Sequence, residues 1–139
     1  MGYYADSIDT DFVVPAANIA AALAAVTEKS RTDSAYTDNW GDQHCDPADK
    51  LVAAVRDRTC FECEVTDDGD FVLSYHNDKW LSETETVLAA LAPFATEGAY
   101  VRLSGEDHCL FGYRVVDGKL RYEYGVTKWR LAGRSAAPW

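Results

Sequence analysis

The stretch GEDHCLFGYRVVDGKLRYEY, residues 105–124, holds the strongest local signal for a fold in this chain. The pair Asp117-Gly118 separates two runs of alternating apolar and polar residues, which predicts a β-hairpin with a two-residue turn. That turn places Tyr113 opposite Tyr122. A slip of one residue would move every apolar side chain to the other face of the sheet, so the register is strongly constrained.

A second turn, over residues 106–108, joins this hairpin to an earlier strand. The apolar faces stay aligned when that turn has three residues, because Leu103 then lies opposite Phe111. We therefore expect a three-stranded meander over residues 99–104, 109–116 and 119–125.

The segments before the meander show strand and helix patterns in turn. Residues 6–13 alternate as a half-buried strand does, with Ile8 and Phe12 on one face. A helix is expected after Pro15, and a short helix after Asp46, because each has a typical helix-starting sequence.

A further hairpin and a third helix are predicted in the middle of the chain. The turn TDDGD, residues 66–70, fits a three-residue connection and leaves His76 on the polar face of the sheet. Its register pairs Val65 with Phe71, Cys63 with Leu73 and Phe61 with Tyr75. The motif SETE, residues 82–85, is a capping box that predicts a helix, and Pro93 should end it.

The order of these elements matches the split βαβ, or ferredoxin-like, pattern with two strands added at one edge. We predict an α+β protein with a ferredoxin-like split βαβ antiparallel sheet, an added C-terminal β-hairpin, and helices on one face. A chain of 139 residues is expected to be a single domain, 1–139. It contains a long polar loop, 30–45, and a C-terminal tail, 126–139.

The charge of the chain is strongly negative and unevenly distributed. The net charge is −10, which argues against direct binding of nucleic acid through its phosphates. The net charge is −6 over residues 1–50, −7 over residues 51–97 and +3 over residues 98–139. We find no signal peptide and no apolar run that could span a membrane. These features predict a cytoplasmic protein whose four cysteines are free thiols.

The acids, histidine and cysteine of residues 106–109 raise the question of a catalytic site. We interpret them as a hairpin tip, because turns favour such residues and strand neighbours point to opposite faces. No motif of a known catalytic type is present, so no catalytic residue and no cofactor are predicted. A metal site remains an alternative, with the ligands Cys45, Cys60, His76 and Cys109.

The sheet face that the helices leave open carries the main candidate binding residues: Tyr100, Arg102, Arg114 and Arg121. The hairpin register places Arg114 opposite Arg121, where like charges repel. Either the acids Asp9, Asp11 and Glu123 compensate this repulsion, or the arginines hold an anionic ligand or an acidic partner. Tyr36 and Trp40 in the polar loop are further candidates, because aromatic residues are enriched at interfaces.

The end of the chain, KWRLAGRSAAPW, residues 128–139, is basic and contains two tryptophans. Two interpretations stay open for it. The tryptophans fold back on their own domain, or the segment docks in an acidic groove of a partner.

Several short motifs carry a resemblance to a known group of proteins. They are MGYY at residues 1–4, Trp80 before the capped helix, and GED followed by the YRVVDGK hairpin. In these motifs the chain resembles small accessory proteins of phages and actinobacteria that open with Met-Gly-Tyr-Tyr. The resemblance implies a mobile-element protein that acts by binding host factors, and it assigns no site residues.

Three functional hypotheses follow. The first is a non-enzymatic binding protein of phage type that inhibits or sequesters a host protein, such as a defence protein, through its acidic surface. The second is a protein that binds an anionic nucleotide on the arginine-bearing face. The third is a metal- or thiol-dependent enzyme.

Overall fold

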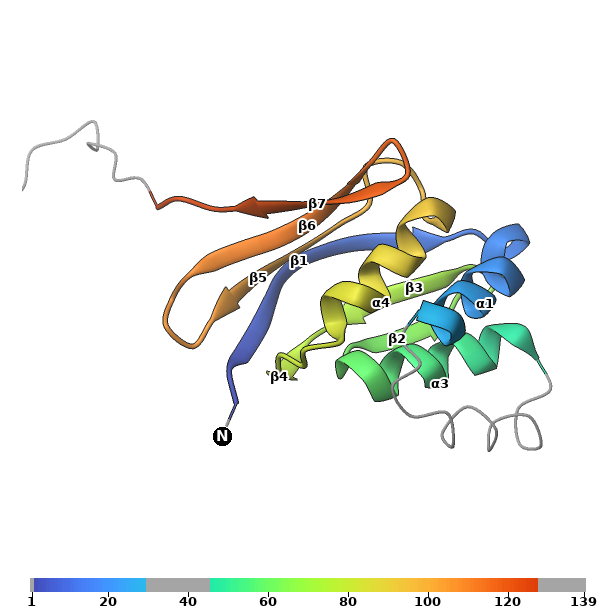
Figure 1. The fold of residues 1–139 in the computed structure, drawn as a ribbon, viewed down its shortest axis with the longest axis horizontal. Helices are drawn as coiled ribbons and strands as arrows, with labels where there is room; N and C mark the ends of the chain where they lie inside the picture. Colours follow the sequence, from blue (N-terminus) through green and yellow to red (C-terminus); the bar gives the residue numbers. More distant parts are fainter. Residues whose placement is uncertain (1, 30–45, 128–139) are drawn as a thin grey trace, which may run out of the picture.

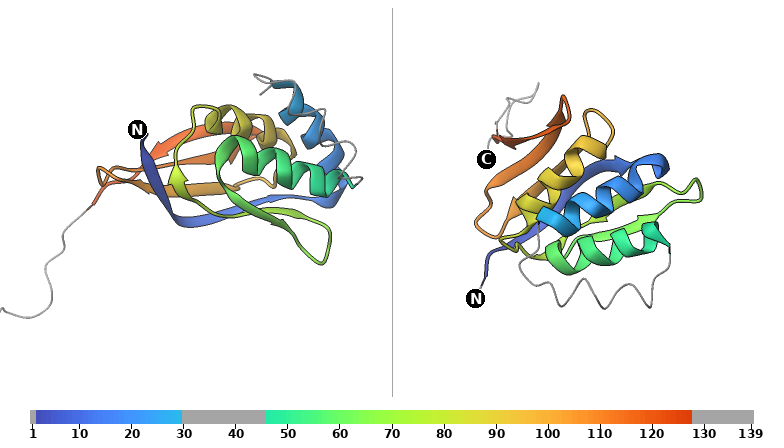
Figure 2. Two further views of the ribbon diagram at one scale, coloured as in Figure 1. Left: turned by 90° about the horizontal axis from the view of Figure 1, so that it is seen from below. Right: turned by 45° about the vertical axis from the view of Figure 1, so that its right-hand side comes forward.

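The structure is a computed structural model that describes residues 2–29 and 46–127. In these ranges the chain forms an antiparallel sheet of seven strands in the order β2-β3-β1-β5-β6-β7, and β4 pairs with β1. Three α-helices lie on one face of the sheet and leave the other face open (Figure 1) (Figure 2). None of the helices in the described ranges has the length and apolar character that a membrane crossing requires.

The elements follow one another along the chain in this order: β1 (Tyr4–Val14), η1 (Ala16–Asn18), α1 (Ile19–Lys29), α3 (Pro47–Thr59), β2 (Glu62–Val65), β3 (Phe71–Tyr75), β4 (Asn77–Lys79), α4 (Thr84–Leu91), η2 (Ala92–Phe94), β5 (Tyr100–Gly105), β6 (Leu110–Val116) and β7 (Lys119–Tyr124). The core lies between the helices and the sheet. Its largest fully buried side chains include Phe12, Phe61 and Phe71.

The ferredoxin-like split βαβ arrangement is not confirmed, although the α+β class, the added hairpin and the one-sided helices are present. The sheet order differs because β1 has two neighbours along one edge. The end of β1 near Phe12 pairs with β3, and its beginning near Ala5 pairs with β4. The strand β4 was not expected, because its three residues are all polar.

The predicted face of Ile8 is wrong. Phe12 is fully buried, whereas Ile8 is exposed. The register of β1 against β5 shifts between Ser7 and Asp9, which is the signature of a β-bulge. A bulge inserts one residue and changes the alternation of faces, so a period of two cannot be carried through it.

The first hairpin departs from its predicted register in the same way. The pairs of Cys63 with Leu73 and of Val65 with Phe71 are confirmed, but Glu62 and not Phe61 lies opposite Tyr75. The register shifts between Glu62 and Cys63, where one step along β2 spans two residues of β3, as in a β-bulge. Just before the strand, Cys60 has a φ of 63° and is the left-handed C-cap of α3.

The predicted helix starts differ in outcome. Asp46 is confirmed as the N-cap of α3, because its carboxylate accepts a hydrogen bond from the Ala48 amide at 3.0 Å. The capping box of α4 is not formed. Glu83 and not Ser82 occupies the N-cap, and no side chain caps the helix there.

His76 lies in the core and not on the polar face of the sheet, which corrects the prediction. Its ring is fully buried. Nδ1 lies 2.8 Å from the Ala5 carbonyl oxygen, and Nε2 lies 3.1 Å from that of Thr59. The rings of Phe61 and Trp80 pack against it with centroids at 4.8 and 5.3 Å. The bend between β3 and β4 turns this residue inward, and strand periodicity does not predict such a bend.

The meander is confirmed. Tyr113 lies opposite Tyr122, and Leu103 lies opposite Phe111. Asp117 and Gly118 have φ values of 53° and 72°, and a type I′ turn requires positive φ at both positions.

Replacement of Gly118 by valine should lower the free energy of unfolding by about 1–2 kcal/mol, because a β-branched residue is strained at positive φ. A Cβ there would meet only the Cα of Pro93, at 3.8 Å, so backbone strain and not a clash is the cause. Urea denaturation measures the change. The control Asp117→Asn should be neutral, because asparagine tolerates this conformation. A Gly118→Val protein as stable as the wild type would show that the turn is of another type.

Candidate functional site

The arginine face consists of Asp9, Asp11, Tyr100, Arg102, Arg114, Arg121 and Glu123 on the open side of the sheet. Strand pairing sets these residues in two rows. One row runs from Asp11 through Tyr100 and Arg114 to Arg121, and the next runs from Asp9 through Arg102 and Gly112 to Glu123. The candidate residues of β5, β6 and β7 are therefore brought together as the sequence predicts.

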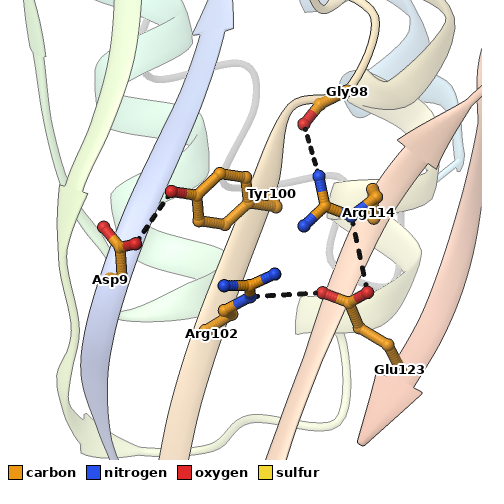
Figure 3. A network of polar contacts seen from close by, with 6 residues as sticks. All are labelled: Asp9, Gly98, Tyr100, Arg102, Arg114 and Glu123. Carbon is orange, nitrogen blue, oxygen red and sulfur yellow. Dashed lines mark hydrogen bonds and ion pairs between the residues drawn. The ribbon is translucent and has the colours of Figure 1, made fainter.

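Glu123 holds the centre of this face, as Figure 3 shows. Its two carboxylate oxygens lie 3.5 Å from Nε of Arg102 and 3.4 Å from Nε of Arg114. Gly112 lies between Arg102 and Glu123 in the row and has no side chain to separate them. A Cβ at Gly112 would lie 2.4 Å from the Val101 carbonyl oxygen, so only glycine fits here.

Tyr100 completes the network. Its hydroxyl donates a hydrogen bond of 2.8 Å to Asp9, and this bond raises the pKa of Tyr100. The guanidinium carbons of Arg102 and Arg114 each lie 4.8 Å from the centre of the Tyr100 ring, within the range of a cation–π interaction.

The predicted opposition of Arg114 and Arg121 is confirmed, and of the acids expected to compensate it, Glu123 forms the ion pair with Arg114. Arg114 also donates a hydrogen bond of 3.2 Å to the Gly98 carbonyl oxygen. Arg121 makes no ion pair with any residue in the described ranges. Two of the three arginines are thus engaged within the protein, which favours a self-neutralised sheet surface over an anion site. Tyr36 and Trp40 lie outside the described residues.

A second surface, which we call the aromatic cleft, opens on the helix side of the sheet beside β6 and β7. Its volume is about 530 Å³. It is lined by Tyr3, Trp80, Asp107, His108, Cys109, Leu110, Phe111, Tyr113, Tyr122, Tyr124, Gly125 and Thr127. The helices gather over β1, β2 and β3, so β6 and β7 lie to one side of the helical layer (Figure 1).

The aromatic cleft exposes side chains that the strand register assigns to the helix-covered face. Tyr122 lies opposite the buried Tyr113, and Tyr124 lies opposite Phe111. Yet Tyr122 is 61% exposed and Tyr124 is 76% exposed. Exposed aromatic side chains gathered in one concave surface are typical of a binding site.

Trp80 forms the wall between the aromatic cleft and the core. Its ring lies 5.2 Å from that of Phe111 and is parallel to that of Tyr113, with centroids 6.2 Å apart. Its amide donates a hydrogen bond of 2.6 Å to the Tyr3 carbonyl oxygen. On the core side its ring packs against Phe61 and His76. The cleft wall is therefore supported by buried residues and does not depend on a ligand for its shape.

Two carboxylates accompany the tyrosines of this cleft. The Tyr3 hydroxyl donates to Asp107 at 2.5 Å, which raises the pKa of Tyr3 to about 12 and lowers that of Asp107. The Tyr113 hydroxyl donates to Glu85 at 2.7 Å. Burial, followed by this bond, raises the pKa of Tyr113. These tyrosines stay protonated at neutral pH, and the Asp107 carboxylate, whose pKa is lowered, places a negative charge in the cleft.

Within the described ranges, Cys63 and Cys109 lack the surroundings of a catalytic thiol. The pKa of Cys109 is raised, chiefly because its thiol donates to the Asp107 carboxylate, whereas a nucleophilic thiol has a lowered pKa. Burial raises the pKa of Cys63 to about 12. In the described ranges no group of three or more histidine, cysteine, aspartate or glutamate side chains gathers as a metal site would. Cys45, the fourth of the predicted alternative ligands, lies outside the described residues.

The sequence contained one signal for the aromatic cleft that points beyond the arginine face. Tyr122 and Tyr124 alternate on the predicted apolar face of the last strand of the meander. Nothing in the sequence indicated that Trp80 and Tyr3 belong to the cleft, because only tertiary packing brings them to the same wall.

Comparison of the chain with protein-family models, with curated proteins and with solved structures found no match.

Replacement of Glu123 by glutamine should lower stability by up to about 1 kcal/mol, the usual size of exposed ion pairs, because it leaves three arginines together. The matched change Arg121→Gln should leave stability unchanged or slightly higher, because it removes a like charge opposite Arg114. Thermal denaturation at low and at high salt measures both, and the Glu123 effect should shrink as salt rises. Equal losses in the two variants would show that Glu123 is not the compensating acid.

The thiols should differ in their reaction with a disulfide reagent in the native state. Cys109 should react, since it is exposed, while the buried Cys63 should be protected. Cys109 should react no faster than a cysteine in an unfolded peptide at the same pH, because its pKa is raised. Labelling followed by mass spectrometry measures each rate. A hyper-reactive Cys109 would restore the hypothesis of a thiol enzyme.

Proposed function

We propose that this chain is a non-enzymatic binding protein that recognises a basic protein partner through the aromatic cleft. The single observation that carries the proposal is the exposure of Tyr122 and Tyr124 beside the Asp107 carboxylate. Tyrosine and tryptophan are the side chains most often found at the energetic centre of an interface.

The charge of the surroundings selects the kind of partner. Residues 1–127 contain all 23 acidic residues and only ten of the 13 basic ones. Such a surface attracts a basic partner over a long range and raises the rate of association. In the cleft, an arginine or lysine of the partner would contact the faces of tyrosine rings and the carboxylate of Asp107.

The resemblance to phage and actinobacterial accessory proteins supports a biological setting for this activity. We infer that the partner is a host protein in the cytoplasm of a bacterial cell, such as a defence protein, and that binding inhibits or sequesters it. An acidic surface suits this role, since a protein that normally binds nucleic acid presents a basic surface.

The two alternative functions have weaker support. An anionic nucleotide on the arginine face would compete with Glu123 for Arg102 and Arg114. The thiol chemistry of an enzyme would need a Cys109 of lower pKa. A panel of nucleotides should therefore leave the melting temperature unchanged, and a stabilising nucleotide would move the binding site to the arginine face.

A photo-crosslinking amino acid in place of Tyr124 tests the proposal in a bacterial lysate. The matched control carries it in place of Tyr75, which is also half exposed but lies on β3, away from the cleft. We expect a basic protein to be captured from position 124 alone. Identical capture from both positions, or from neither, would contradict the proposal.

The captured protein is then purified and titrated. The double variant Tyr122→Ala Tyr124→Ala should bind it at least about 10-fold more weakly, as expected for central interface residues. The control Tyr75→Ala should bind it as the wild type does. Wild-type affinity in the double variant would exclude the cleft as the interface.

A further inference from the structure

The described part of the chain ends inside the aromatic cleft. Gly125 and Thr127 belong to its lining, and the Gly125 amide donates a hydrogen bond of 2.9 Å to the Leu110 carbonyl oxygen. This bond continues the pairing of β6 and β7 by one residue. In the sequence, the segment 128–139 follows directly after Thr127, a residue of the cleft lining.

The chemistry of this segment complements that of the cleft. It contains Lys128, Arg130 and Arg134 and no acid, whereas every acidic residue of the chain precedes it. It also contains Trp129 and Trp139, two of the four tryptophans. Indole rings and guanidinium groups are the side chains that pack best on exposed tyrosine rings, and Asp107 supplies the opposite charge.

We propose that residues 128–139 are the occupant of the aromatic cleft in the isolated protein, and that they act as an internal competitor for the partner. Twelve residues span at most about 40 Å when extended, so the segment is long enough to reach across a cleft that Thr127, the residue before it, helps to line. A covalent connection of this kind gives an effective concentration in the millimolar range, so docking requires only weak contacts.

A docked segment would shield the exposed rings of Tyr122 and Tyr124 from water. A partner must displace the segment, so the apparent affinity falls by the fraction of molecules in which the cleft is covered. The inference uses the same cleft as the proposed function, but it does not require that a partner exists. Its test uses the purified full-length chain alone, so its failure would leave the proposed function standing.

The native Cys109 in the cleft wall provides the test, because its thiol is exposed. In a full-length protein with Cys45→Ser and Cys60→Ser, the change Ala137→Cys places a second reactive thiol near the chain end. A short bis-maleimide joins two thiols only when they approach each other. The matched control replaces Cys109 by serine and adds Ser74→Cys, an exposed position on β3.

We expect an intramolecular crosslink to Cys109 that forms at least about 10-fold faster than the crosslink in the Ser74→Cys control. The rate should fall toward the control value in Tyr122→Ala Tyr124→Ala and in the variant with all three basic residues of the segment replaced by glutamine. Peptide mapping by mass spectrometry identifies the joined residues, and circular dichroism checks that each variant is folded.

Three results would overturn the proposal. Equal rates for Cys109 and the Ser74→Cys control would mean that the segment has no preferred position. Unchanged rates in the cleft and charge variants would mean that it lies near Cys109 without using the cleft. A crosslinked dimer would mean that the segment of a second copy occupies the cleft.

Discussion

The buried imidazole of His76 contacts the elements that support the aromatic cleft. It lies between the carbonyl oxygens of Ala5 in β1 and Thr59 at the end of α3. Its ring also supports Trp80, whose other contacts form the wall of the aromatic cleft. One side chain thereby links the central strand β1, the end of α3 and the wall of the aromatic cleft.

The side chains exposed on the two faces of the sheet differ in how well water solvates them. On the arginine face, Glu123 neutralises two cations, and the missing side chain of Gly112 lets it reach the farther one. Charged groups are stable in water, so that face needs no partner. On the helix side, Tyr122 and Tyr124 expose apolar rings that water solvates poorly. The difference in solvation, and not the number of charges, makes the aromatic cleft the better candidate.

Charge is also distributed along the chain in a way that fits both proposals. The acids all precede residue 124, and the last three basic residues all follow residue 127. A basic partner and the basic C-terminal segment would therefore be attracted by the same surface. Binding controlled in this manner depends on salt and on the length of the segment, and both can be changed without altering the cleft.

The sequence by itself determined the local parts of this protein. Asp117-Gly118 set the turn and register of the last hairpin, and Asp46 set the start of α3. These signals act over a few residues, because they depend on backbone conformation and on the period of two in a strand. The opposition of Arg114 and Arg121 followed from that register.

Only the tertiary structure decided which strands share an edge of β1, where His76 lies, and that Trp80, Tyr3 and Tyr122 form one cleft. The register shifts after Ser7 and after Glu62 interrupt the periodic patterns from which faces are predicted. The cleft depends on contacts between residues far apart in the chain, such as Trp80 with Phe111 and Tyr3 with Asp107, and no local pattern encodes them.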